Sequence, residues 1–233
     1  MVAAGSLGIH RRDHESMSDG VHTPPCFDEA FRDRLKQLLN WRRDVRHFRP
    51  DPVPDDILDE CLMLAHHAPS VGLSQPWRFV RVQDHERLAR VIASFERANA
   101  TALAATAEED HALYARLKLA SLKDAPVQLA VFCDEETPTG RRLGQRTMPE
   151  TRAYSVVCAI HTLWLALHAH GLGMGWLSIV EPREVAAACD APPSWKFIAW
   201  LSIGWPDDNA ISDMPELVRA GWEKRRPFAI KTL

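Results

Sequence analysis

The chain has 233 residues, of which 46% are hydrophobic and 25% are charged, and its formal net charge is −3. This length suits one large domain or two small ones, and the near-neutral charge gives no reason to expect a nucleic-acid partner. No apolar run reaches the roughly 18 residues that a membrane span requires, so no membrane partner is expected either.

Residues 1–26 are polar and without periodicity. They predict a flexible tail rather than a secretory signal, which needs a basic stretch followed by an apolar one. The five cysteines are widely spaced and form no Cys-x-x-Cys pair. This spacing predicts reduced thiols in a cytoplasmic protein. His161 and His168 share a helix face, but no acidic or cysteine ligand accompanies them, so no metal site is expected.

Two helices and a strand are predicted in the first third of the chain. Apolar residues recur at helical spacing over 27–43, and a second helix is expected from Asp55 to about Pro69. A loop follows at 70–76, and the alternation of apolar and charged residues over 77–82 predicts a strand.

The middle of the chain contains a segment whose structure the sequence leaves open. An alanine-rich helix is expected over 86–107. Residues 108–124 are polar and amphipathic, which fits either another helix or a mobile cover, so they form the candidate lid. The continuous apolar run 127–133 predicts a buried strand.

The last third is dominated by a long helix at 150–170. This helix is apolar almost all round, so it is expected to be buried in the core or in a subunit interface. A strand at 176–180, a short helix at 182–189 and a strand at 197–203 follow. Strands that alternate with helices predict an α/β or α+β sheet covered by helices. No linker interrupts residues 27–233, which are therefore expected to form one domain.

The segment Arg42-Arg43-Asp44-Val45-Arg46 places three arginines around one carboxylate. Guanidinium groups bind phosphate or carboxylate in bidentate fashion, so the segment suggests an anion site with a chemically active Asp44. The alternative is structural, because arginines in the last turn of a helix stabilise its negative end by roughly 0.3–1 kcal/mol. The spacing alone leaves both interpretations open.

The loop Ser70–Trp77 is a second candidate site. A glycine-containing loop that leads through Gln75-Pro76-Trp77 into a strand would expose backbone donors and small hydroxyls to a ligand. The alternative is a plain helix-to-strand turn with Trp77 in the core. The glycine-rich run Gly171–Gly175 precedes a strand rather than following one, so a helix stop and close packing explain it better than a dinucleotide site.

The two candidate sites together resemble a known family. The pattern Arg-Arg-x-x-Arg-x-Phe at 42–48, a helix, and Pro-Ser-x-x-x-x-Gln-Pro-Trp at 69–77 resemble the flavin-binding nitroreductases over residues 27–233. The resemblance implies an α+β three-layer fold, with a mostly antiparallel sheet flanked by helices, a long buried core helix and an intertwined homodimer that forms its flavin sites at the subunit interface.

The resemblance also implies FMN as the bound flavin, with its phosphate on the arginines and its ring beside the loop before Gln75. The residues it assigns to FMN are Arg42, Arg43, Asp44, Val45, Arg46, Pro69, Ser70, Ser74, Gln75, Trp77, Leu177, Ser178 and Arg225. The late Gly204-Trp205-Pro206 and the basic residues around Arg225 would complete the site.

Two positions depart from ordinary nitroreductases, which usually carry Ser or Thr in place of Asp44 and Asn in place of Ser74. With these residues the chain is similar to a flavin-consuming branch of the family. This similarity implies that reduced FMN reacts with O2 and is fragmented to 5,6-dimethylbenzimidazole and D-erythrose 4-phosphate, for the lower ligand of vitamin B12. Asp44 would act as a general base, and Ser178 would orient oxygen by hydrogen bonding.

In that branch the flavin is a substrate, and a separate flavin reductase supplies the reduced FMN. The alternative is an NAD(P)H-dependent FMN nitroreductase or flavin reductase, in which the flavin stays bound and is recycled. Asp44 separates the two hypotheses, because hydride relay alone has no use for a carboxylate at this position.

Overall fold

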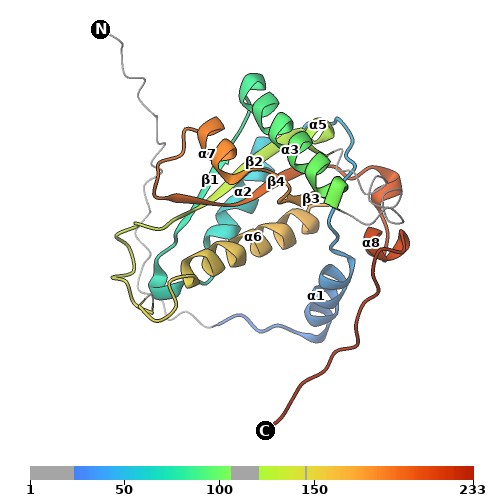
Figure 1. Cartoon of the computed structure of the whole chain (residues 1–233). Coiled ribbons are helices and arrows are strands. Elements are labelled where there is room, and N and C mark those ends of the chain that lie inside the picture. The colour runs from blue at the N-terminus through green and yellow to red at the C-terminus, as the bar shows by residue number, and fades with distance from the viewer. Residues whose placement is uncertain (1–23, 106–120, 145) are drawn as a thin grey trace.

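The computed structural model describes residues 24–105, 121–144 and 146–233 (Figure 1). Nearly all of the predicted tail, and the candidate lid up to residue 120, lie outside the described residues. The described helices, including two short 3-10 turns, are α1 (Glu29–Trp41), α2 (Asp55–His66), η1 (Val71–Leu73), α3 (His85–Ala105), α5 (Ser121–Asp124), α6 (Thr151–Ala169), α7 (Pro182–Ala188), η3 (Asp208–Ala210) and α8 (Glu216–Arg219).

The described strands form one antiparallel sheet in the order β1-β2-β4-β3. They are β1 (Trp77–Arg81), β2 (Val127–Asp134), β3 (Gly173–Leu177) and β4 (Trp195–Gly204). The apolar run predicted as a buried strand is central strand β2, and all of its residues but the last are buried. The predicted antiparallel sheet is confirmed.

Strand β3 begins at Gly173, earlier than the predicted start at 176, and ends at Leu177 rather than at 180. Glycines weaken a strand, so the sequence favoured a start after them. The backbone nevertheless pairs with β4 from Gly173 onward, and Gly175 lies opposite Ser202. Because Ser178 lies one residue beyond β3, it belongs to the exposed connection that follows the strand.

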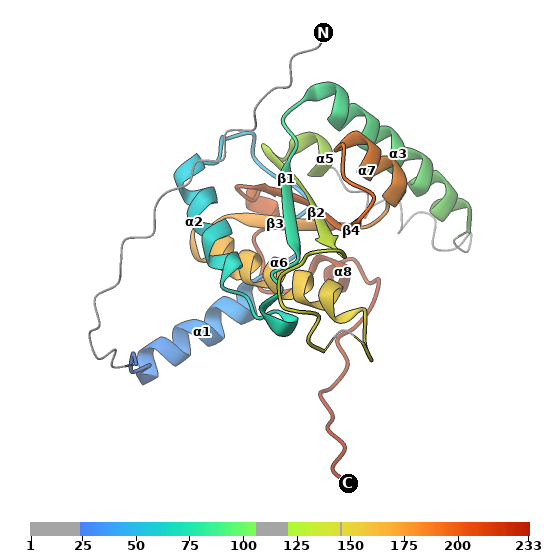
Figure 2. The same cartoon turned by 90° about the vertical axis from the view of Figure 1, so that its left-hand side faces the viewer.

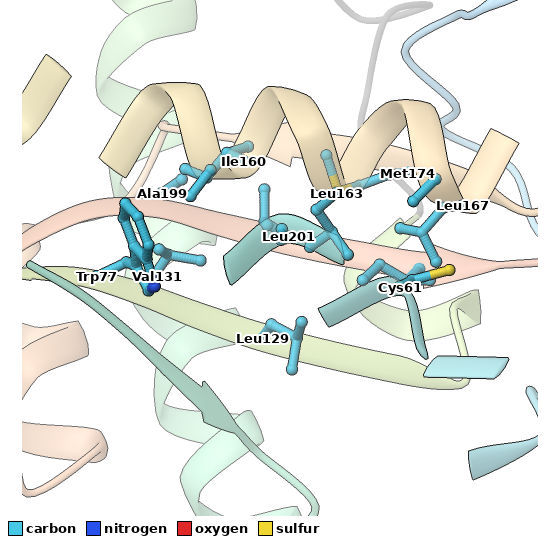
Figure 3. Close-up of a cluster of buried hydrophobic side chains, with 14 of the residues drawn as sticks. Cys61, Trp77, Leu129, Val131, Ile160, Leu163, Leu167, Met174, Ala199 and Leu201 are labelled. Carbon is cyan, nitrogen blue, oxygen red and sulfur yellow. The ribbon is translucent and has the colours of Figure 1, made fainter. Parts of the chain in front are cut away.

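Helices cover both faces of the sheet and give the three layers that the family resemblance implies (Figures 1 and 2). Helices α2 and α6 pack on one face, where Leu129 and Leu163 belong to the main core (Figure 3). Helices α3 and α7 cover the other face, where Phe95, Phe132 and Val185 form a second core. Such layered burial of apolar surface is the main stabilising contribution to the fold.

Two helices expose apolar side chains that a single chain leaves uncovered. Helix α1 has no buried residue, projects from the body of the molecule (Figure 2), and leaves Leu35 40% and Trp41 48% exposed. Helix α6 buries one side against the sheet, but Tyr154 and Val157 on its other side are 54% and 41% exposed. The predicted all-round apolar helix is therefore only half covered within one chain.

The main chain before α2 approaches β3 very closely. The Val45 amide donates to the Met174 carbonyl at 3.1 Å, and Asp44 forms an isolated parallel bridge with Met174. A Cβ added at Gly173 would lie 2.7 Å from a methyl group of Val45, and one at Gly175 would overlap the Val45 carbonyl oxygen. The close packing predicted for these glycines is confirmed, and it places the segment around Asp44 against the sheet.

Gly175→Ala should push this segment away from β3. Overpacking of this kind costs about 1–3 kcal/mol, and the free energy of unfolding measured in urea should fall by that amount. Met174→Leu, a volume-conserving change in the same strand, is the control and should cost less than about 1.5 kcal/mol. A Gly175→Ala protein as stable as the wild type would contradict the close approach.

Candidate active site

The arginine-rich turn follows α1 and is held by backbone and indole hydrogen bonds. The Arg42 amide donates to the Leu38 carbonyl at 3.0 Å and ends the helix. The indole N–H of Trp164, on α6, donates to the Arg43 carbonyl at 3.1 Å. With the Val45–Met174 hydrogen bond, these contacts fix the turn between α6 and β3.

Three of the predicted arginines converge. The Arg42 guanidinium lies 4.6 Å from the centre of the Trp164 ring, in cation–π range. Burial lowers the pKa of Arg42 and of Arg43, and nearby Arg225, from the distant C-terminal segment, lowers both further. Like charges gathered in this way repel one another, so the cluster is suited to an anion that would neutralise it.

Arg43 has an incompletely satisfied guanidinium. It donates to the Arg42 carbonyl at 2.7 Å and to the Asp213 carbonyl. Its Nε is buried and has no hydrogen-bond partner among the described residues. An unpaired buried donor is costly, so this atom is a further reason to expect an anionic ligand at the turn.

Arg46 faces carboxylates. Its Nε lies 3.2 Å from Asp44 Oδ2 and 3.8 Å from Glu216 Oε2, and its side chain is only 12% exposed. The resemblance grouped Arg46 with the phosphate-binding arginines. The structure shows ion pairs of Arg46 with Asp44 and Glu216, and its contact with a phosphate stays a prediction. Glu216, at the start of α8, was missed because only the tertiary fold brings it to the turn.

Asp44 is held by two donors on opposite oxygens. Its Oδ1 accepts from the Trp176 amide at 3.0 Å, and its Oδ2 accepts from Arg46 Nε at 3.2 Å. Burial raises the pKa of Asp44; the Trp176 amide and Arg46 oppose the rise, and the charge of Glu216 adds to it. The net pKa is raised although a third of the side chain reaches solvent, so Asp44 binds a proton more readily than an ordinary aspartate.

The loop before β1 is well ordered by local contacts. Ser70 Oγ accepts from the Gln75 amide at 3.1 Å, and Ser155 Oγ of α6 accepts from the Val71 amide at 3.0 Å. Trp77 is 5% exposed and lies in the main core (Figure 3), as the structural alternative proposed. Its indole N–H donates to His66 Nδ1 at 3.1 Å.

Ser74 is enclosed rather than presented to a ligand. It is 1% exposed, and its hydroxyl has no hydrogen-bond partner among the described residues. A Cβ added at Gly140 would lie 2.9 Å from the Ser74 Cβ, so the segment around Gly140 closes over it. Contact between Ser74 and a flavin therefore stays a prediction that requires this segment to move.

The two predicted halves of the site lie apart within one chain. Helix α6 contacts the loop through Ser155 and the arginine-rich turn through Trp164. At 1.5 Å per residue these two positions are about 13 Å apart along the helix axis. Arg42, Arg43 and Arg225 are brought together, whereas Ser70 and Gln75 belong to the other end of α6.

Leu177 and Ser178 directly follow Trp176, whose amide donates to Asp44. Leu177 is the last residue of β3 and is 1% exposed in the second core, and Ser178 follows it and is exposed. His168, considered above only as a metal candidate, lies near the arginines: burial, Arg42 and Arg43 lower its pKa. None of the described helices is long and apolar enough to cross a membrane.

The model of the nitroreductase family matches residues 39–205. The chain belongs to this family. It is 56% identical to the 5,6-dimethylbenzimidazole synthase of Rhodospirillum rubrum over 90% of this chain and 99% of that protein. A 5,6-dimethylbenzimidazole synthase of Rhodobacter capsulatus is 45% identical over 86% of this chain and 96% of that protein.

A similar solved structure is oxidized iodotyrosine deiodinase bound to FMN and 3-iodo-L-tyrosine. It has a TM-score of 0.68 and 26% identity, and the match covers 85% of this chain and all of that chain. The architecture around the turn and the sheet is therefore that of a nitroreductase-family protein whose relatives include one solved with FMN.

The raised pKa of Asp44 predicts a pH effect on stability. Between the ordinary aspartate pKa, about 3.9, and the raised pKa in the folded protein, the folded state binds more protons than the unfolded state. The stability contributed by Asp44 is therefore lost as the pH rises through this window. Relative to Asp44→Asn, the wild type should lose free energy of unfolding between low and neutral pH in urea titrations; a constant or opposite difference would contradict the raised pKa.

Proposed function

We propose that this protein uses O2 to cleave reduced FMN into 5,6-dimethylbenzimidazole and D-erythrose 4-phosphate. The 5,6-dimethylbenzimidazole provides the lower ligand of vitamin B12. The observation that carries the proposal is a proton-accepting carboxylate, Asp44, enclosed by the turn that gathers Arg42 and Arg43 with Arg225. The near full-length similarity to proteins named 5,6-dimethylbenzimidazole synthase supports it.

The arginine cluster holds the FMN phosphate. A dianionic phosphate relieves the mutual repulsion of Arg42, Arg43 and Arg225 and offers an acceptor to the buried Nε of Arg43. The phosphate is at one end of the ribityl chain, so binding it at the turn brings that chain towards Asp44 and Val45. The FMN-bound relative iodotyrosine deiodinase supports a flavin site in this fold.

Asp44 acts as the general base beside the ribityl chain, and Ser178 acts at the flavin ring. Reduced flavin supplies the electrons for O2, and this chain's residues bind, orient and move protons. The Trp176 amide orients the Asp44 carboxylate through Oδ1, and its raised pKa lets it accept a proton from the ribityl chain. The Ser178 hydroxyl donates a hydrogen bond that orients oxygen beside the ring, without nucleophilic attack.

The second half of the site comes from another copy of the chain. The loop with Pro69, Ser70, Ser74, Gln75 and Trp77 meets α6 at Ser155, whereas the arginine-rich turn of the same chain meets α6 at Trp164. A two-fold dimer that covers the exposed apolar sides of α1 and α6 brings a partner's loop to the turn. Residues 108–124 are proposed to close over this composite site.

Reducing equivalents arrive with the substrate. A separate cytoplasmic flavin reductase supplies reduced FMN, and the flavin is consumed rather than recycled. The alternative activity, NAD(P)H-dependent nitroreduction with bound FMN, has the support of family membership. Nitroreduction requires no carboxylate at the position of Asp44, and the fragmentation activity is favoured for this reason.

Aerobic incubation with chemically reduced FMN tests the activity. The wild type should convert FMN to 5,6-dimethylbenzimidazole, detected by mass spectrometry, and Asp44→Asn should reduce the rate by about 100-fold or more, the scale of a lost general base. Asp51→Asn, at an exposed carboxylate beside Arg49, is the control and should leave the rate unchanged. Intact FMN returned in full by the wild type, or steady NADPH-dependent nitroaromatic turnover, would favour the alternative.

A charge on α1 tests the composite site. Leu35→Glu should convert a dimer to a monomer in sedimentation velocity and weaken FMN binding at least about tenfold, because the partner's loop is lost. Ala187→Glu, at an exposed position of α7 on the opposite face of the sheet, is the matched control and should change neither property. A wild-type monomer at every concentration, or a Leu35→Glu monomer with unchanged FMN affinity, would contradict this arrangement.

A further inference from the structure

Arg46 lies between two carboxylates that come from distant parts of the chain. Its Nε is 3.2 Å from Asp44 Oδ2 and 3.8 Å from Glu216 Oε2. Only 12% of the Arg46 side chain and 27% of the Glu216 side chain are exposed, so solvent screens these charges less than at an open surface. The Arg46 guanidinium therefore interacts with two carboxylates, Asp44 and Glu216, in a partly enclosed space.

Glu216 reaches this place because the C-terminal segment folds back over the turn. The Asp213 carbonyl accepts from Arg43, α8 follows Pro215, and Arg225 is close enough to Arg42 and Arg43 to lower their pKa. The same segment thus supplies a cation to the phosphate cluster and a carboxylate to Arg46. The two contributions act on different charges of the site.

We propose that Glu216 is a positioning residue that shares Arg46 with Asp44 and so prevents Asp44 from being held in a full ion pair. Within the described part of the chain, the charged groups that act on Asp44 are Arg46, Glu216 and Arg42, and the Trp176 amide also donates to it. Among the charged groups Glu216 is the one whose sign opposes the ionised form of Asp44. Its importance for catalysis rests on the proposed function, but its effect on Asp44 does not.

An arginine that lies between two carboxylates interacts with each of them less strongly than it would with one alone. A guanidinium that faces one carboxylate stabilises the ionised form and weakens that group as a base. A second carboxylate repels the first and draws on the same donors, so the first binds a proton more tightly. A base that must accept a proton from a weakly acidic carbon or hydroxyl gains driving force from this arrangement. Burial is the main cause of the raised pKa of Asp44, and the charge of Glu216 adds to the rise in the direction that this arrangement requires.

The direct test is a carboxyl titration in the flavin-free, full-length protein. Aspartate residues are labelled with ¹³C at the carboxyl carbon, and the Asp44 resonance is assigned by its loss in Asp44→Asn. In Glu216→Gln the midpoint of this resonance should move to lower pH by about one unit, the scale of removing one close like charge. Glu216→Asp, which withdraws the carboxylate by one methylene, should move it in the same direction by less.

The matched control is Glu223→Gln, which removes the same charge from the same segment. Glu223 is exposed and accepts from the Lys224 amide, so the Asp44 midpoint should stay where it is in the wild type. An unchanged or raised midpoint in folded Glu216→Gln and Glu216→Asp proteins, with melting temperatures near that of the wild type, would overturn the proposal.

A second readout links the carboxylate pair to the reaction. In Glu216→Gln the acidic limb of the pH–rate profile for reduced FMN should move to lower pH and the plateau of kcat should fall, with KM for reduced FMN unchanged. A purely structural role would lower the rate at all pH values without moving the limb. If the midpoint moves but the wild type forms no 5,6-dimethylbenzimidazole, the proposed function fails while the role of Glu216 towards Asp44 stands.

Discussion

The close approach of the Val45 main chain to strand β3 is the contact on which the site depends. It is possible only because Gly173 and Gly175 present no side chains on that side of the strand. The approach gives Asp44 its Trp176 amide donor, and on α6 the Trp164 indole donates to the Arg43 carbonyl and stacks against the Arg42 guanidinium. The glycines of this chain therefore position its charged residues by letting a neighbouring segment pack on strand β3, and not by forming a phosphate-binding loop.

The fold brings charged groups together although their burial and mutual repulsion are unfavourable. Burial and mutual repulsion disfavour the ionised forms of Arg42 and Arg43, and burial disfavours the ionised form of Asp44. Such arrangements are frequent at functional sites, because a ligand or a reaction compensates for what the fold loses. Two carboxylates on Arg46 and three guanidiniums near one another divide the turn into a proton-accepting part and an anion-binding part.

Much of the fold could be predicted from periodicity, because its strands and helices bury continuous apolar surfaces. The long helix α6 and the buried strand β2 carry strong local signals. Strand β3 was misplaced because its start is determined by pairing with β4, which no local pattern records. The all-round apolar character of α6 was read correctly, but only the structure shows which side the single chain leaves open.

The residues of the site that are adjacent in sequence could be predicted. Those that only the tertiary fold brings together could not. Arg42, Arg43 and Asp44 are adjacent in sequence, so their grouping was visible. The ion pair of Glu216 with Arg46 and the effect of Arg42 and Arg43 on the pKa of His168 join residues far apart in the chain, and no sequence spacing encodes them. The enclosure of Ser74 likewise depends on the distant segment around Gly140.

In the proposed complex, the phosphate of FMN binds the arginines of one chain while Asp44 lies beside the ribityl chain. An anaerobic crystal structure with reduced FMN tests this arrangement most directly. We expect phosphate oxygens within hydrogen-bond distance of Arg42, Arg43 and Arg225, with the Asp44 carboxylate next to the ribityl carbons. A phosphate bound elsewhere, or a ribityl chain directed away from Asp44, would contradict it.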